Sequence, residues 1–431
     1  MADPYVEAGS RLFEGMLART HTTPPARVAE VVAEELESAL GARDVTVFMV
    51  NLEETALVPI PRRDRLQPEP QDIENSMVGR SFTGSKVLSA PGAEAGRLRA
   101  FVPLIDGTDR LGALQADVTV DGSDQLPEPL VRLLERYGHA IAQVLLAKHH
   151  YGDALHLVQR SRPLELGAEL LASVLPPATF ATDGLVISAM VQPAYENGGD
   201  AFDYAVNEDA VHLAVFDAVG HGLQAARLST FAVAAYRWCR RAGQGLPETY
   251  AALDAAMAEQ FRAEDFTTGI LAELNPDAGV LRFVNAGHPP PLLLRGDRTV
   301  KVLDAARTTP LGLPLFGTEP TVVEERLESG DIVVLYTDGV TEARDATGSL
   351  LGVDGLIEFL QREATAEEPP PETLRRLRGD LTSEDGPLLT DDATVLLVYW
   401  HRGAERSLLP QTVSTNQEAS SGSASGPSTE T

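Results

Sequence analysis

The sequence predicts an α+β protein with two domains, and three observations support this. The chain has 431 residues, which is too long for one compact core. Residues 22–148 place helical and strand-like patterns around a polar stretch, whereas residues 179–402 are mainly apolar strands joined by glycine-rich turns. Several of these strands are apolar at nearly every position, which indicates covered sheet faces. We therefore expect the second domain to be a four-layer α-β-β-α sandwich, two packed sheets with helices outside.

The composition excludes several classes of partner. Acidic residues number 63 against 35 lysines and arginines, so the net charge is −28. Such a surface repels nucleic acids and anionic membranes, and the sequence contains no basic patch. No apolar run approaches the ~18 residues of a membrane span, and the N-terminus lacks a signal-peptide core. We expect a cytoplasmic protein whose lone cysteine, Cys239, is a small core residue.

The pattern of the first part of the chain predicts a helix followed by a helix-flanked sheet. Residues 1–21 carry a modest amphipathic pattern, and Thr22 to Pro25 then start a second helix that ends at Gly41. Pro127 and Pro129 open a long helix that closes the domain. Residues 60–99 are rich in Pro, Arg, Asp and Gly and are expected to be a loop. The expected strands are 45–50, 56–59, 100–105 and 111–118.

A connector and a tail complete the expected organisation. Residues 149–178 contain two short amphipathic segments and end at Pro176-Pro177. This connector is either a spacer or a seam that pairs with a second copy. Residues 403–431 are low in complexity and are expected to be disordered. Two helices, at about 222–242 and 246–264, should interrupt the strands of the second domain.

Acidic residues follow one rule in the second domain, because they stand beside glycines or at the edges of apolar strands. An acid at the end of a strand opens onto the edge of the sheet, where turn carbonyls are also exposed. Any one of these acids alone could simply cap a turn. The acids are Asp200 and Asp203 in ENGGDAFD, Asp217 in FDAVGHG, Asp338 in YTDGVTEA, and Asp391 and Asp392 in LTDDATV.

If these strand ends meet, the acids require a counter-ion. Two carboxylates in close contact repel by about 4 kcal/mol at an effective dielectric near 20. The ligands are carboxylates without a Cys or His set at zinc spacing, so the hard ions Mn²⁺ or Mg²⁺ are indicated. Two such ions about 3.5 to 4 Å apart bind a bridging water, lower its pKa and direct it at phosphorus. The predicted chemistry is hydrolysis of a phosphate ester without a protein nucleophile.

Residues 22–148 resemble a GAF-like sensory domain. The order of a helix, two strands, a long crossing, two strands and a closing helix carries this resemblance, and FVPLIDGTDRLGALQADV is its most similar part. No residue in it fixes a ligand, so a small-molecule ligand and a role limited to dimerisation both remain open. We expect a homodimer formed through the helix at 127–150 and the connector.

Residues 165–400 resemble the metal-dependent type 2C protein serine/threonine phosphatases, in particular the SpoIIE-like bacterial branch. Five segments carry the resemblance in order: QPAYENGGDAFD, FDAVGHGLQAA, FTTGILAELNPDAGVLRFVNAGHPPPLLL, LESGDIVVLYTDGVTEARDATG and LTDDATVLLV. The resemblance implies a phosphatase sandwich and a phosphoserine or phosphothreonine substrate on a small regulatory protein, of the anti-sigma factor antagonist type. It also implies control by the N-terminal sensory domain.

The resemblance also implies a role for individual residues. Asp217 bridges two metal ions, and the carbonyl of Ala218 completes one coordination sphere. Asp338 and Asp391 hold one ion from the far side, and Asp200 binds the second ion directly or through water. Asp217, Asp338 and Asp391 are the expected catalytic residues.

Other motif residues receive secondary roles. Asp203 matches the second acid of its motif and is a weaker candidate. His221 and His288 are expected to set turns by packing and hydrogen bonding, and residues 267–269 (Thr-Thr-Gly) to line the floor of the site. Many relatives have valine or glycine in place of Ala218, but only its backbone is needed. Neither a phosphate-clamping arginine nor a general acid is assigned.

Two functions from other classes compete with the phosphatase. One is a catalytically weak scaffold that binds a phosphoprotein or a sigma-factor regulator, although a decayed site should have lost at least one acid. The other is a switch that responds chiefly to a small molecule bound by residues 1–150. Both are consistent with a sigma-factor partner-switching pathway.

Overall fold

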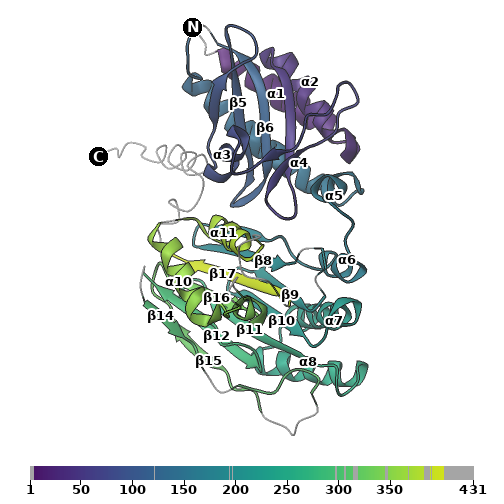
Figure 1. The fold of residues 1–431 in the computed structure, drawn as a ribbon, viewed down its shortest axis with the longest axis vertical. Coiled ribbons are helices and arrows are strands. Elements are labelled where there is room, and N and C mark those ends of the chain that lie inside the picture. The colour runs from purple at the N-terminus through teal and green to yellow at the C-terminus, as the bar shows by residue number, and fades with distance from the viewer. Residues whose placement is uncertain are drawn as a thin grey trace, which may run out of the picture. The chain divides into compact units, whose positions relative to one another are not determined.

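The chain divides into two compact units, with the boundary between Ser161 and Arg162 (Figure 1). The computed structural model describes residues 4–401 apart from 121, 194, 197, 297–298, 305–306, 314–318, 345–347, 367, 383–388 and 390. The predicted disordered tail, residues 403–431, lies outside the described residues. No helix within the described residues is long and apolar enough to cross a membrane.

The first unit is an antiparallel six-stranded sheet with helices on both faces. Its strand order is β3-β2-β1-β6-β5-β4. The strands are β1 (Arg43–Val50), β2 (Ala56–Pro59), β3 (Gln71–Asp72), β4 (Leu88–Pro91), β5 (Arg97–Asp106) and β6 (Asp109–Thr119). The helices are α1 (Pro4–Thr20), the 3₁₀ turn η1 (Pro25–Arg27), α2 (Val28–Leu40), α3 (Met77–Gly84), α4 (Glu128–His149) and α5 (Ala154–Gln159).

The main core of this unit lies between the sheet and helices α1, α2 and α4. Leu12 and Met16 of α1 are fully buried there, together with Tyr137 of α4. The first helix is therefore part of this core. Leu155 of α5 joins the same core, so the first half of the predicted connector packs on the first unit.

The prediction that residues 60–99 form only a loop is wrong, because they include α3, β3 and β4. Ser76 caps α3 by accepting a hydrogen bond from Gly79 N. A side chain at Gly79 would place its Cβ 2.0 Å from Ile73 O, so the glycine permits a close approach. Val78 and Phe82 then pack on the second face of the sheet. Tertiary packing thus overrides the weak helix propensity of a segment that contains two glycines.

The second unit contains two antiparallel sheets. Their orders are β15-β12-β11-β10-β9 and β14-β13-β16-β17-β8-β7. The strands are β7 (Thr179–Thr182), β8 (Leu185–Gln192), β9 (Asp200–Val206), β10 (Val211–Ala218), β11 (Thr267–Asn275), β12 (Val280–Ala286), β13 (Leu292–Arg295), β14 (Thr299–Val302), β15 (Val323–Arg326), β16 (Ile332–Tyr336) and β17 (Ala393–Trp400). The helices are α6 (Leu166–Ala172), α7 (Gly222–Arg241), α8 (Leu246–Gln260), α9 (Asp338–Glu342), α10 (Gly352–Thr365) and α11 (Pro370–Thr382).

Three hydrophobic cores stack these elements into the predicted four-layer α-β-β-α sandwich. The middle core joins the two sheets, for example Val215 of β10 with Leu396 of β17. A second core lies between the first sheet and helices α7 and α8, and it contains the buried Cys239 as predicted. A third core covers the other sheet with α10 and α11. Figure 1 shows these helices on opposite sides of the strands.

The second half of the predicted connector belongs to this unit. Helix α6 packs against α7, and its Leu171 lies in the core beneath α7. The stretch 149–178 is therefore divided between the units instead of forming one continuous helix. Strand β9 was not expected, because its first residues were interpreted as a glycine turn.

Candidate functional site

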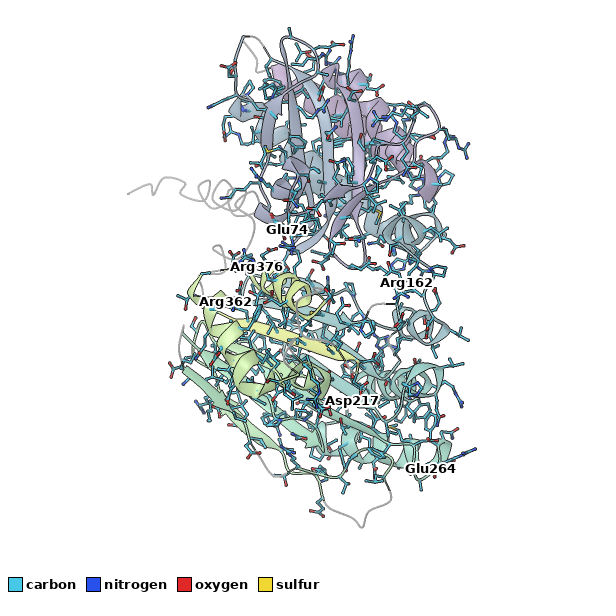
Figure 2. All side chains as sticks on the ribbon, in the orientation of Figure 1. Glu74, Arg162, Asp217, Glu264, Arg362 and Arg376 are labelled. Atoms are coloured by element: carbon cyan, nitrogen blue, oxygen red, sulfur yellow. The ribbon has the colours of Figure 1, made fainter. Side chains whose placement is uncertain are left out.

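Asp200 and Asp217 are direct cross-strand neighbours at one end of the sandwich. Asp200 begins β9 and pairs in register with Asp217 near the end of β10. Side chains alternate between the faces of a strand, and Leu213 and Val215 of β10 lie in the core between the sheets. Asp217 therefore faces the space between the two sheets, among the strands of the second unit (Figure 2). Asp200 faces the same space, because directly opposed residues share a face.

Thr337 connects the facing sheet to Asp200. Its hydroxyl donates a 2.6 Å hydrogen bond to Asp200 Oδ2 and accepts a 2.8 Å hydrogen bond from Thr394 N. Thr337 follows β16, and the next residue, Asp338, begins α9. The end of β16 and the start of β17 are thus held against the start of β9. This brings Asp338 to the same end of the sandwich.

The Asp391-Asp392 pair reaches the same place from the start of β17. Asp392 Oδ2 accepts hydrogen bonds from Gly198 N at 2.9 Å and Gly199 N at 2.6 Å. Asp391 is exposed, and its Oδ1 accepts a 2.8 Å hydrogen bond from Asp392 N. Two adjacent amide donors form a small anion cradle, so the glycines of ENGGDAFD anchor Asp392.

The carbonyl oxygen of Ala218 lies beside this anchor. A Cβ placed on Gly199 would stand 3.1 Å from Ala218 O and 3.4 Å from Asp392 Oδ2. Ala218 N also donates a 3.1 Å hydrogen bond to Gly199 O. The backbone oxygen named from the sequence is therefore close to the acids, as a ligand role requires.

Acidic neighbours raise the pKa values of two of these carboxylates. Burial raises the pKa of Asp217, and the negative charges of Asp338, Asp391, Asp392 and Glu342 raise it further, to about 7. Burial also raises the pKa of Asp338, with added repulsion from Glu342 and Asp391. The charged neighbours named here are all acidic, so the carboxylates of three separate stretches lie within electrostatic reach of one another.

Asp200 lies deepest in this cluster, with an exposed fraction of 1%. Burial and the charge of Asp217 raise its pKa well above the usual value, while the hydrogen bond from Thr337 opposes the shift. A buried carboxylate is costly when ionised. A bound cation would remove that cost.

Buried acids elsewhere in the chain are stabilised differently, because each is paired with arginine. These pairs are Asp117 with Arg99 at 2.6 Å, Asp331 with Arg295 at 2.8 Å, and Asp203 with Arg237 at 2.6 Å and Arg240 at 2.7 Å. The acids of the cluster stand out against this pattern. The charged neighbours that shift Asp217 and Asp338 are acids, and a bound cation would offset their repulsion.

Asp203 is not part of the cluster, so its interpretation as a weaker ligand candidate is wrong. It lies three residues after Asp200 on β9, which turns its side chain to the opposite face, toward α7. There its two oxygens bind Arg237 and Arg240. Asp203 therefore fastens α7 to the sheet.

His288 sets a turn, as predicted. Its Nε2 lies 3.0 Å from Tyr336 O, so it donates to that carbonyl, and Nδ1 therefore accepts from Thr268 Oγ1 at 2.8 Å. Burial lowers the pKa of His288 to about 3, so the ring stays neutral. Asn285 fixes the backbone of the turn by accepting from His288 N and donating to His288 O. The ring thus ties β11 to β16 behind Asp217.

Two predictions for neighbouring residues are corrected. His221 is exposed at the N-cap of α7 and makes no capping hydrogen bond, so the packing role expected of it is wrong. Of residues 267–269, Thr268 pairs with Asp217 and shares its face. Thr267 points to the opposite face. Gly269 has no side chain, and a Cβ there would stand 2.8 Å from Val215 O. Of these three residues, Thr268 is therefore the one whose side chain lies on the face of Asp217.

Reasoning from the sequence missed three contributors to the cluster. Asp392, anchored by the glycines, was treated as secondary to Asp391. Glu342 lies four residues after Asp338 on one turn of α9, a spacing that brings two side chains together on a helix. Thr337 precedes Asp338 directly, and in this position its hydroxyl can reach the opposite strand. Two features of the sequence could have indicated these residues: the adjacent acids in LTDDATV, and the four-residue spacing of the acids in DGVTE.

The donor set suits a hard divalent cation. It consists of carboxylate oxygens and a backbone carbonyl, the oxygen ligands that Mg²⁺ and Mn²⁺ prefer. Across the described residues, no group of three or more His, Cys, Asp or Glu side chains is arranged to hold a metal ion directly. The acids therefore lie within electrostatic reach of one another, but their side chains are not arranged around a common metal position. A bound ion would have to draw their side chains together.

Comparison with known proteins found a matching family model and several similar proteins. Residues 207–401 match the family model described as Stage II sporulation protein E (SpoIIE). Phosphoserine phosphatase RsbU of Bacillus subtilis is 26% identical over 191 residues, which cover 43% of this chain and 56% of RsbU. Stage II sporulation protein E of Priestia megaterium is 26% identical over 168 residues, which cover 37% of this chain and 28% of that protein.

Solved structures of similar domains were also found. The SiaA-PP2C domain of Pseudomonas aeruginosa is 21% identical, with a TM-score of 0.46, and the match covers 55% of this chain and 94% of that one. The RsbU and RsbW domains of a Mycobacterium tuberculosis protein are 28% identical, with a TM-score of 0.44, covering 51% of this chain and 61% of that one. The fold itself rests on the sheets and cores described above.

The sandwich and the acids at one of its ends are the features that the resemblance to type 2C phosphatases predicted. The SpoIIE model matches residues 207–401, which is less than half of this chain. The chain spans about half the length of the curated relatives it matches, from 56% of RsbU to 28% of the Priestia megaterium protein.

Proposed function

We propose that this chain is a metal-dependent protein serine/threonine phosphatase. The observation that carries the proposal is the cluster of mutually repelling carboxylates around Asp217, at one end of a sandwich whose residues 207–401 match the SpoIIE model. The name of one relative, phosphoserine phosphatase RsbU, gives the same reaction class. A phosphate monoester is its chemical substrate.

The acids and one backbone carbonyl would hold two Mn²⁺ or Mg²⁺ ions. Asp217 would contact both ions, Asp338 and Asp391 one of them, and Asp200 the other, directly or through water. The Ala218 carbonyl would complete one coordination sphere. Bound ions of this kind lower the pKa of a coordinated water so that it can attack phosphorus. The anchored Asp392 adds negative charge beside Asp391.

The protein substrate is proposed to carry phosphoserine or phosphothreonine and to be a regulator of the anti-sigma factor antagonist type. The first unit, proposed to be a GAF-like sensory domain, would control the activity. Homodimerisation through α4 and the connector is also proposed, and a monomeric mass for residues 1–178 in light scattering would contradict it. Removal of residues 1–150 should change the turnover of the remaining chain if the first unit regulates it.

A phosphatase assay tests the proposal directly. The full chain should hydrolyse a phosphoserine peptide with Mn²⁺, lose that activity in EDTA, and lose it as the Asp217→Asn variant. Asp209→Asn is the matched control, because Asp209 is exposed in the turn at the opposite end of the same strand pair. Activity that persists in EDTA, or in Asp217→Asn, would contradict the metal mechanism. A folded chain that binds Mn²⁺ without any turnover would instead support the scaffold.

A further inference from the structure

A cavity of about 570 Å³ lies within the first unit, beside strand β2. Ligand sites in proteins typically measure about 300 to 1,000 Å³. Ala56 and Val58 of β2 form one wall, and Ala154, Leu157 and Val158 of α5 form the opposite wall. The cavity is therefore large enough for a small molecule of drug-like size.

The lining is mainly apolar and contains no carboxylate. Alanine, valine, isoleucine, leucine and proline dominate it, and Arg160 contributes the one cationic side chain among the lining residues. Leu157 leaves 63% of its surface exposed at this wall. The lining of this cavity presents no negative charge to a ligand. It favours an apolar molecule that is neutral or carries an anionic group.

Polar side chains in the lining are already engaged by the protein. Asn51 Oδ1 accepts hydrogen bonds from Thr55 N and Ala56 N, both at 2.9 Å. Gln67 Nε2 donates to Pro59 O at 3.0 Å, and Ser161 Oγ donates to Glu53 Oε1 at 2.7 Å. Affinity would therefore come mainly from the removal of apolar surface from water.

The wall formed by α5 is anchored, so the cavity is preformed. Leu155 is fully buried in the core of the unit. Leu52 N donates a 2.9 Å hydrogen bond to Gln159 O, and Gln159 Nε2 donates a 3.3 Å hydrogen bond to Val50 O. A preformed cavity binds without the cost of ordering a loop.

We propose that this cavity is a binding site for a small, mostly apolar molecule that carries one anionic group. The apolar body would lie between β2 and α5 and cover Leu157, and the anionic group would lie at Arg160. Because α5 ends just before the boundary between the units, the site adjoins the segment that joins them. The proposal does not depend on the phosphatase activity.

Two fluorescent probes test the site in the full chain. 1-Anilinonaphthalene-8-sulfonate has two aromatic groups and one anionic group, and N-phenyl-1-naphthylamine is its neutral analogue. We expect saturable binding of both at one site, with tighter binding of the sulfonate. Val58→Phe and Ala154→Phe fill the cavity from opposite walls and should weaken both probes at least tenfold. Val6→Phe is the control, because Val6 is 70% exposed on α1 and does not line the cavity.

The outcomes separate the parts of the proposal. Circular dichroism and a cooperative melt establish that each variant is folded, and either wall variant alone suffices. Absence of saturable binding, or unchanged affinity in a folded wall variant, would overturn the site. Arg160→Gln should weaken the sulfonate and leave the neutral probe unchanged. Equal binding of the sulfonate by Arg160→Gln would overturn the anionic preference.

Discussion

Thr337 Oγ1 donates a 2.6 Å hydrogen bond to Asp200 Oδ2 across the end of the two sheets. Thr337→Val keeps the shape of the side chain but removes this donor. Residues that orient a metal ligand typically contribute about 10- to 100-fold to metal affinity. We expect a loss of Mn²⁺ affinity of that order by isothermal titration calorimetry. Thr365→Val is the control, because Thr365 is exposed at the end of α10. Equal Mn²⁺ affinity of Thr337→Val and wild type would show that this bond does not orient Asp200.

The stability of the metal-free protein should fall as the pH rises from about 4 to 7. The pKa of Asp217 is raised from 3.8 to about 7 in the folded chain, so in this range the folded protein holds a proton that the unfolded chain has lost. Stability falls with pH wherever the folded state binds more protons. Urea unfolding at several pH values should show this slope. The slope should be smaller in Asp217→Asn and in wild type with Mn²⁺, and a flat profile in metal-free wild type would contradict it.

Gly198 and Gly199 should respond differently to alanine. A Cβ at Gly198 would stand 2.3 Å from Gly222 N, so Gly198→Ala must shift the backbone and lower the melting temperature. A Cβ at Gly199 would stand 3.1 Å from Ala218 O and 3.4 Å from Asp392 Oδ2, which is tight but nearly tolerable. Gly199→Ala should therefore melt close to wild type yet bind Mn²⁺ more weakly. Unchanged Mn²⁺ binding in Gly199→Ala would place the ion away from Ala218 O.

Asp203→Asn separates a structural acid from the acids of the cluster. Removing the charge leaves Arg237 and Arg240 without their buried partner. Loss of one partner of a buried ion pair typically costs about 3 to 5 kcal/mol. We expect a loss of that order in urea unfolding at pH 7, with Mn²⁺ affinity retained at a temperature where the variant is folded. Weakened Mn²⁺ binding in a fully folded variant would return Asp203 to the site.

The sequence was sufficient to predict the sandwich and the placement of several acids at one end of it. Apolar strands such as β10 and β17 have an unambiguous pattern, and Asp217 and Asp338 follow such strands closely. It was not sufficient to separate Asp200 from Asp203. Once β9 is known to be a strand, the spacing of three residues assigns them to opposite faces, but the two glycines that precede β9 indicated a turn. The partners of Asp203 lie more than thirty positions away on α7, which no local pattern reveals.

The same limit applies to the DD pair and to the first unit. Asp391 and Asp392 are chemically identical in the sequence, and only the amides of Gly198 and Gly199 distinguish them. Helix α3 was missed because its glycine is required by the close approach of Ile73 O, a contact made in the folded state. The cavity beside β2 depends on the packing of α5, which the pattern of a short connector does not specify.

Titration of Mn²⁺ into the metal-free full chain, followed by calorimetry, tests the central claim most directly. If the clustered carboxylates form a cation site, wild type and Asp209→Asn should bind two ions with the same affinity, and Asp217→Asn should lose at least one of them. Absence of Mn²⁺ binding by wild type, or unchanged binding by Asp217→Asn, would contradict the account.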